Sequence, residues 1–152
     1  MIKHITPKLF KFILNIYPPY LGTGISVKSI SFDYKNVTVQ MKMRWYNKNY
    51  VNTHFSGSIY AMTDPFFMLM LLQILGPSYV VWDKSATIDF IKPGRGTLTA
   101  KFCLSDEDIN NILKNCENGK KYLPEFTVYV KDEQNDIVAK VKKVLYIKKK
   151  KP

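Results

Sequence analysis

The chain has 152 residues, 46% of them hydrophobic, which is enough to bury one core of ordinary size. Its net charge of +11 comes almost entirely from lysine, because arginine occurs only at Arg44 and Arg95. Such a charge suits a phosphate-rich partner, but without arginine forks or a recognition motif we expect no nucleic-acid binding.

The termini and the cysteines exclude several other classes. Lysines and a proline interrupt residues 1–16, where a secretory signal would be apolar, so we expect a cytoplasmic protein. Cys103 and Cys116 lack metal-ligand spacing and predict neither a metal site nor a disulfide framework. We expect a single domain over residues 1–152, with an N-terminal helix inside residues 1–20 and a solvated basic tail at residues 148–152.

The first elements are an amphipathic helix and two strands. Apolar residues at helical spacing predict a helix over Pro7–Tyr17, capped by Thr6 and ended by two prolines. Two strands are predicted after it, joined at Lys35 and Asn36, over the ranges Ile25–Tyr34 and Val37–Trp45.

The segment Gly57–Leu75 is apolar on nearly every side and predicts one long helix. Polar residues and Pro65 interrupt it, so it is too broken for a transmembrane span and we expect no membrane insertion. An apolar helix in a chain made mostly of strands must be buried by a sheet. We therefore place it at the centre of the fold.

The remaining segments predict a second half of the sheet. A surface helix begins with Ser105 as its cap and ends at Gly119. The strands are expected over Tyr79–Ile91, Thr97–Leu104, Tyr122–Lys131 and Ile137–Lys148. This order predicts an α+β fold in which an antiparallel sheet of about six strands wraps around one long central helix.

Three stretches carry a family resemblance. The block Asn49–Pro65 resembles the entrance to the central helix in PaaI-like hotdog thioesterases. The stretches Val81–Ala86 and Lys92–Gly96, together with that block, are more similar still to a related bacterial hotdog family of unassigned function. The resemblance implies a hotdog fold and hydrolysis of an acyl thioester of coenzyme A, with the coenzyme as part of the substrate and no other cofactor.

The PaaI-like pattern also implies site residues. Its His-Gly-Gly motif, with an upstream asparagine and a downstream acid, places the second glycine at Gly57 and the acid at Asp64. The same register places the asparagine at Asn49, the first glycine at Ser56, and Phe55 where the family has histidine. His54 is displaced from that position by one residue.

These residue types suit thioester hydrolysis. Backbone N–H groups near Ser56 and Gly57 could polarise the thioester carbonyl, and Asp64 could activate water, with a raised pKa if it is buried. Each has a structural alternative. Gly57 could serve packing alone, Asp64 could accept hydrogen bonds at the kink before Pro65, and Asn49 could form a turn instead of positioning water.

A second set of residues is expected to bind substrate. Asp83 and Lys84 are adjacent in a strand, so they face opposite sides and one must point inward, either as a site group or in a structural ion pair. The remaining candidates are His54 and Phe55 at the entrance, Lys92 and Arg95 as clamps for the coenzyme phosphates, and Met62 and Phe67 against the acyl chain. Structural histidine contacts, solvated loop charge and ordinary core packing are the respective alternatives.

Three functions remain open at this stage. The first is an acyl-CoA thioesterase acting on a medium or long acyl group as a homodimer, or as a tetramer of paired dimers. The second is a non-catalytic acyl-CoA or fatty-acyl binding protein, which Phe55 and Ser56 favour because they depart from the motif. The third is a basic protein that associates with anionic membranes or nucleic acid through its lysine tail.

Overall fold

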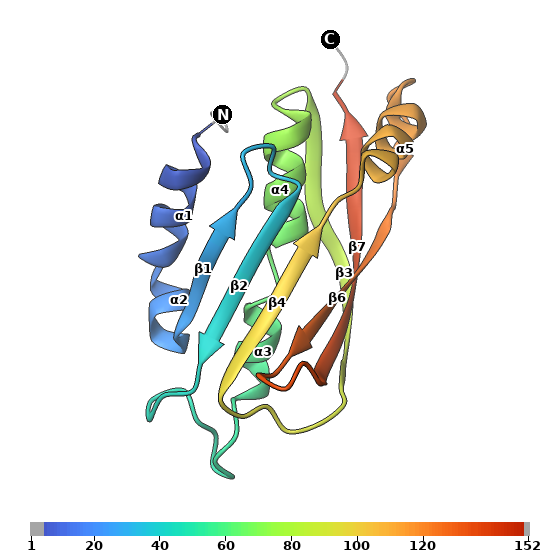
Figure 1. The fold of residues 1–152 in the computed structure, drawn as a ribbon. Coiled ribbons are helices and arrows are strands. Elements are labelled where there is room, and N and C mark those ends of the chain that lie inside the picture. Colours follow the sequence, from blue (N-terminus) through green and yellow to red (C-terminus); the bar gives the residue numbers. More distant parts are fainter. Residues whose placement is uncertain (1–4, 151–152) are drawn as a thin grey trace.

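The computed structural model describes residues 5–150. Its central feature is one curved antiparallel sheet that encloses a helical segment (Figure 1). The strands are β1 (Ile25–Ile30), β2 (Asn36–Lys42), β3 (Tyr79–Phe90), β4 (Thr97–Cys103), β5 (Lys121–Tyr122), β6 (Glu125–Lys131) and β7 (Ile137–Lys149). Their order across the sheet is β1-β2-β4-β6-β7-β3, and the two-residue β5 also pairs with β7. The expected sheet of about six strands is confirmed, with β5 as an additional short strand.

The enclosed segment consists of two helices, α3 (Ser56–Ala61) and α4 (Phe66–Leu75). The central helical segment predicted over Gly57–Leu75 is confirmed, with an interruption between its two helices. Residues 62–65 break it, because Pro65 supplies no N–H to the helix ladder and disfavours helical geometry at the residue before it. By length and composition alone Ser56–Leu75 could cross a membrane, yet half of its most apolar window is buried inside this fold.

The core lies between α4 and the inner face of the sheet. Phe66 and Phe67 of α4 meet the ring of Phe102 on β4 at centroid distances of 4.9 and 5.2 Å. Phe67 also stacks on Phe126 of β6 at 4.9 Å. The alternation of apolar and polar residues in the strands places one apolar row inward, which explains why the sheet curls over the helix.

The two long edges of the sheet differ. Helix α1 (Pro7–Asn15) covers the β1 edge, where the side chain of Asn15 accepts from the N–H of Val27 at 2.6 Å and donates to its carbonyl at 3.1 Å. Strand β3 forms the other edge and pairs only with β7 among the described residues. Residues 84–87 are exposed on both faces of that strand. The open edge is therefore the one next to α4.

The terminal segments complete the fold and correct three boundaries. The predicted N-terminal helix is α1, which ends at Asn15 before the two prolines, and these prolines begin an additional short helix, α2 (Pro18–Thr23). The predicted first strand ends at Ile30, and Tyr34 lies in the following turn. Lys148 and Lys149 belong to β7 and are not part of a solvated tail, and residues 151–152 of that expected tail lie outside the described residues. Helix α5 (Asp106–Cys116) carries the predicted Ser105 cap, reinforced by Asp108.

Candidate active site

Asp64 lies in the break between α3 and α4, where the backbone turns away from helical geometry. Its side chain is 50% exposed, so the carboxylate is only partly buried. The break itself explains the exposure, because it brings the side chain to the side of the helical segment that faces β7. A half-exposed carboxylate at this place can meet both a protein cation and a water molecule.

The cation is Lys143 of β7, which is fully buried. Its ammonium donates a hydrogen bond to Oδ1 of Asp64 at 3.0 Å and lies 3.2 Å from Oδ1 of Asp83 on β3. The contact with Asp83 is an ion pair without hydrogen-bond geometry, since that oxygen has no hydrogen-bond partner. The ammonium also lies 5.4 Å from the ring centroid of Tyr60 on α3. Lys143 therefore connects α3, the helix break, β3 and β7.

The cluster holds two carboxylates around one ammonium. Burial alone would lower the pKa of Lys143, but its hydrogen bond to Asp64 and the charge of Asp83 hold that pKa above its ordinary value. Burial raises the pKa of Asp83, although Lys143 opposes the shift. Burial likewise raises the pKa of the Tyr20 hydroxyl of α2, and the charge of Asp64 adds to that effect. The site thus keeps Lys143 charged while making a second negative charge on Asp83 costly.

A bulge in β3 orients Asp83. The register between β3 and β7 shifts between Asp83 and Ser85, so that Lys84 has no opposite residue. Asp83 points inward with 22% of its side chain exposed, and Lys84 faces solvent. The sequence prediction that one of the two residues points inward is confirmed, and the structural alternative of an ion pair is the one observed for Asp83 in this chain.

Sequence reasoning missed Lys143, although a signal for it existed. Lys142 and Lys143 are adjacent in a strand, so the same parity argument that was applied to Asp83 and Lys84 requires one of them to point inward. Lys142 faces out and pairs with Glu125 at 2.9 Å. Lys143 takes the inward row between the buried Val141 and Leu145.

The loop before α3 is held by Asn49 and His54. The Asn49 carboxamide accepts from the N–H groups of Val51 and Thr53 at 3.1 and 3.0 Å, and it donates to the Thr53 hydroxyl at 2.7 Å. These are the bonds of a turn former, so Asn49 serves the loop in this chain. His54 is 1% exposed and its Nε2 lies 2.9 Å from the carbonyl oxygen of Gly96. Both residues join the loop together and fix the start of α3.

Ser56 and Gly57 begin α3 at the surface. Among the described hydrogen bonds neither backbone N–H has an acceptor, as expected for the first turn of a helix. A side chain on Gly57 would meet the ring of Phe55 at 2.5 Å, so Phe55 closes over this turn. Phe55 is itself 57% exposed. The helix has only six residues, so its dipole is smaller than the long helix would have provided.

The turn between β3 and β4 contains the expected phosphate clamps. Lys92 forms ion pairs with Asp132 and Asp136 at 2.6 and 2.7 Å, which tie this turn to the β6–β7 hairpin. Arg95 is exposed and donates to the carbonyl of Asn52 at 3.2 Å. Gly94 between them packs on Ile59 of α3, where a side chain would approach to 3.4 Å. The turn therefore lies against the entrance to α3.

The expected acyl-binding residues belong to the core. Met62 and Phe67 are 0% and 2% exposed and pack beneath the sheet. Whether either touches an acyl chain stays a prediction. Met62 lies in the break, two residues before Asp64, whereas Phe67 lies in the first turn of α4.

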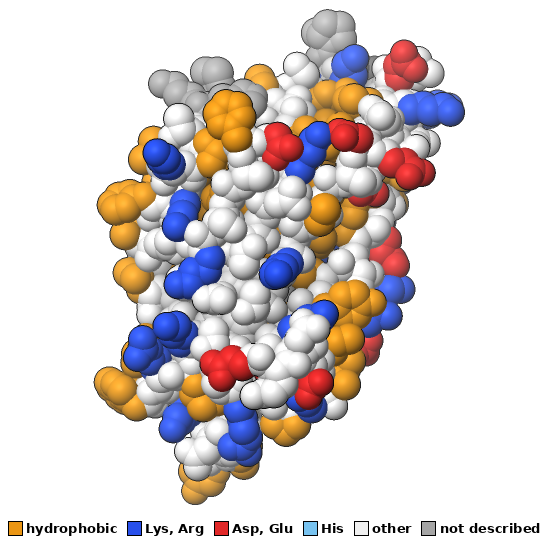
Figure 2. All heavy atoms as spheres, in the orientation of Figure 1, with side chains coloured by type: hydrophobic (Ala, Val, Ile, Leu, Met, Phe, Trp, Pro, Cys, Tyr) orange, Lys and Arg blue, Asp and Glu red, His pale blue; other side chains and the backbone are white. Residues whose placement is uncertain are grey.

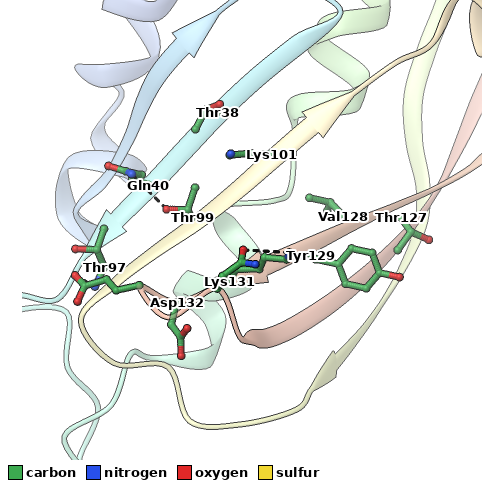
Figure 3. Close-up of a pocket in the computed structure, with 12 residues that line it drawn as sticks. Thr38, Gln40, Thr97, Thr99, Lys101, Thr127, Val128, Tyr129, Lys131 and Asp132 are labelled. Atoms are coloured by element: carbon green, nitrogen blue, oxygen red, sulfur yellow. Dashed lines mark hydrogen bonds between the residues drawn. The ribbon is translucent and has the colours of Figure 1, made fainter.

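A separate hollow of about 590 Å³ lies on the outer face of the sheet (Figure 3). It forms where β4 and β6 diverge, because these strands are paired only through Thr99 and Ala100 of β4. Its lining is mostly hydroxyl and amide, with Gln40 donating to the Thr99 hydroxyl at 3.3 Å. None of the residues predicted for the site lines it. It lies on the opposite side of the sheet from Asp64.

A known protein family matches almost the whole chain. The family described as "Domain of unknown function (DUF4442)" matches residues 6–147. The chain belongs to this family. That membership agrees with the predicted similarity to a hotdog family of unassigned function. No functionally curated protein matches the sequence.

Solved structures of the same shape identify the fold. A Pseudomonas aeruginosa protein, described as of unknown function and a probable thioesterase, superposes with a TM-score of 0.87 at 15% identity over 97% of this chain and all of that one. A Haemophilus influenzae thioesterase gives 0.69 at 13% identity, over 95% of this chain and 92% of that one. The E. coli PaaI protein of the phenylacetic acid degradation operon gives 0.60 at 15% identity, over 92% and 89%. The fold is the hotdog fold, as predicted.

Proposed function

We propose that the protein hydrolyses the thioester of an acyl-coenzyme A, with Asp64 as the base that activates water. The observation that carries the proposal is Asp64 itself: half exposed, placed at the break of the central helix, and held by the buried Lys143. A fixed carboxylate with one side open to solvent is suited to general-base work. The thioesterases among proteins of the same fold support the reaction class.

The proposed chemistry uses groups of this chain. A water hydrogen-bonded to Asp64 attacks the thioester carbonyl carbon while the carboxylate takes its proton. The carbonyl oxygen becomes an oxyanion that the free N–H groups of Ser56 and Gly57 can stabilise, each worth about 3 kcal/mol of barrier. The carbon–sulfur bond then breaks, and the thiolate of coenzyme A leaves with the proton that Asp64 returns. Asp83 and Lys143 position Asp64 and do not touch substrate in this scheme.

The proposed site has two halves, the Asp64 carboxylate and the N–H groups of Ser56 and Gly57, which lie at opposite ends of α3. This separation favours a homodimer. Asp64 contacts β7 next to the open β3 edge, whereas Ser56 and Gly57 lie one helix earlier in the chain. A two-fold partner that continues the sheet at β3 would bring its own α3 entrance toward Asp64. We therefore propose a site shared by two chains; pairing of dimers into tetramers is compatible with it. A cytoplasmic location stays a prediction.

The coenzyme is expected to lie along the turn between β3 and β4. Arg95 is exposed there and has one hydrogen bond to a carbonyl, so its guanidinium is available for a phosphate. Lys92 is already paired with two carboxylates and is the weaker clamp. The acyl group would enter toward Met62 and Phe67. A medium or long chain suits those apolar side chains.

Non-catalytic binding of acyl-CoA or a fatty acyl group is the second candidate. It is favoured by Phe55, which stands where the PaaI-like motif has its histidine and which covers Gly57. An aromatic ring over the N–H groups would restrict access of the thioester to them. Binding through Arg95 and the apolar side chains would survive that restriction.

The test is a panel of acyl-coenzyme A thioesters of increasing chain length, with release of free thiol as the readout. The proposal expects turnover that depends on chain length and saturates with substrate. Calorimetry on the same preparation measures binding of each thioester. Binding without thiol release at any length would replace the hydrolase with the binding protein.

A further inference from the structure

The outer surface of the N-terminal helices is apolar although nothing in the described chain covers it. Helix α1 packs on β1 through its inner face, where Leu14 is buried. The opposite face and α2 carry six large apolar side chains between 43% and 60% exposed: Leu9, Phe12, Ile13, Ile16, Tyr17 and Leu21. We call these six residues the N-terminal apolar surface. Contiguous exposed apolar residues of this kind mark an interaction site.

Two aromatic residues extend this surface at its lower end. Trp45 is 86% exposed and packs edge-on against Tyr46 at a centroid distance of 5.6 Å. The Tyr46 hydroxyl reaches within 3.4 Å of the position that a side chain on Gly24 would take, at the end of α2. The loop is joined to α2 by the Asn47 carboxamide, which donates to the carbonyl of Thr23 at 3.0 Å. Exposed tryptophan and tyrosine are the residues that favour a membrane–water interface.

Basic side chains predominate in the part of the chain that contains this surface. The first 63 residues contain eight Lys or Arg and one acidic residue, Asp33, so they carry +7 of the net charge of +11. Lys8 and Lys11 lie on α1 itself, and Arg44 and Lys48 flank the aromatic loop. Figure 2 shows hydrophobic and basic side chains together along the side where Figure 1 places α1 and α2. Apolar side chains ringed by lysine are the pattern of a helix that lies in an anionic membrane surface.

We propose that the N-terminal apolar surface docks the protein on membranes that contain anionic lipid. The α1–α2 unit lies at the β1 edge of the sheet, away from the open β3 edge. Docking through the outer faces of α1 and α2 would leave the β3 edge free, and the α2 residue nearest to Asp64 is the buried Tyr20 on the inner side. The proposal is independent of the hydrolase, because it rests on none of the residues assigned to hydrolysis. It also differs from binding through the lysine tail, since Lys148 and Lys149 are part of β7.

The test is cosedimentation of the full chain with vesicles of phosphatidylcholine, with and without phosphatidylglycerol. We expect binding only to vesicles with phosphatidylglycerol, and release by high salt. The double variant Phe12→Ser and Leu21→Ser should lower vesicle affinity by about tenfold or more. Its control is Tyr129→Ser, which changes a 42% exposed tyrosine on β6, away from α1 and α2 in the sheet order. That control should bind as the wild type does.

A second pair of variants tests the charge. Lys8→Glu with Lys11→Glu should lower the affinity by at least about tenfold. Lys101→Glu with Lys120→Glu changes the net charge equally at exposed positions elsewhere and should have the smaller effect. Equal loss in both pairs would show charge attraction without a docking surface and would overturn the proposal.

Two further results would overturn it. Absence of wild-type binding to anionic vesicles is the first. The second is a fall in the mass measured by light scattering for Phe12→Ser with Leu21→Ser in the absence of vesicles, because it would show that a second copy of the chain covers this surface. Thermal melting of each variant verifies that it is folded, and all four substituted apolar and charged positions of the surface lie on the outside of α1 and α2.

Discussion

Lys143 is the residue on which the candidate site depends. A buried ammonium is tolerated only when it is paired, and here Asp64 and Asp83 share it. We predict that Lys143→Met lowers the free energy of unfolding by about 2 to 3 kcal/mol, the lower part of the usual range because Asp64 is half exposed. Chemical denaturation followed by circular dichroism measures the loss.

A matched double variant separates the lost ion pair from lost packing. Lys143→Met with Asp83→Asn removes the cation and its more buried partner together, so it should be more stable than Lys143→Met alone. Equal stability of the single and double variants would show that Asp83 is indifferent to Lys143. In that case the cluster would not be an electrostatic unit.

His54 gives the fold a dependence on pH. Burial lowers the pKa of His54 in the folded state, and the hydrogen bond to the Gly96 carbonyl only partly opposes the shift. The unfolded chain therefore binds a proton at this histidine more readily than the folded chain does. The contribution of neutral His54 to the free energy of unfolding is full above the ordinary histidine pKa of about 6.5, and it is lost as the pH falls below that pKa. We predict that the melting temperature of the wild type falls more between pH 7.5 and pH 5.5, roughly one unit either side of that value, than that of His54→Gln. Parallel curves for the two proteins would assign the acid sensitivity to other groups.

The sequence identified some of the site residues and missed others. The missed lysine depends on which face of a strand it occupies. Asp64 was found mainly from its place in the PaaI-like motif, and Asp83 because it alternates with Lys84 in a strand. Lys143 was missed because three lysines within residues 140–143 looked like a solvated face, and only the strand register decides which of them points inward. Asn49 is hydrogen-bonded within its own loop and Lys92 is paired with the β6–β7 hairpin. A sequence pattern does not predict such tertiary contacts.

At the scale of elements, the sequence predicted every long strand and a kink at Pro65, but not that the kink divides the central segment into two helices. The run of apolar residues indicates that the segment is buried, but it does not indicate whether the helix is continuous. Pro65 was the available signal, since proline disfavours the preceding residue in helical geometry. The break brings Asp64 out of the core to meet both Lys143 and solvent, which the proposed hydrolysis requires.

The open β3 edge leads to a prediction about assembly. Residues 84–87 of β3 are exposed on both faces, and Phe90 near its end is 50% exposed, which a second β3 would cover. We predict that Ala86→Asp with Phe90→Asp converts a dimer into a monomer of 17.7 kDa, because the added carboxylates would repel those on the partner's β3 across the two-fold axis. Light scattering at micromolar concentration measures the mass.

The control for assembly is Phe32→Asp, which places a charge on an exposed phenylalanine far along the sheet from β3. It should remain a dimer. A monomeric wild type would contradict the shared site directly, and a β3 variant that stays dimeric would place the interface elsewhere.

At the scale of the whole molecule, the sheet has one covered edge and one open edge, and the two serve different purposes in our account. The covered edge carries the N-terminal apolar surface, with Lys8 and Lys11 on α1. The open edge lies beside Asp83 and Lys143. Membrane docking and hydrolysis are thus assigned to different surfaces of one fold. The family and the fold are established, and the reaction is the claim that most needs a measurement.

That measurement is the turnover of Asp64→Asn beside its melting temperature, in one preparation and against the best acyl-coenzyme A substrate of the wild type. The amide keeps the size of the side chain and can still contact Lys143, but it cannot accept a proton from water. We predict that kcat falls by a factor on the order of 10² or more while the thioester still binds. A variant with wild-type turnover per folded molecule and a shifted melting temperature would show that Asp64 only steadies the break between α3 and α4.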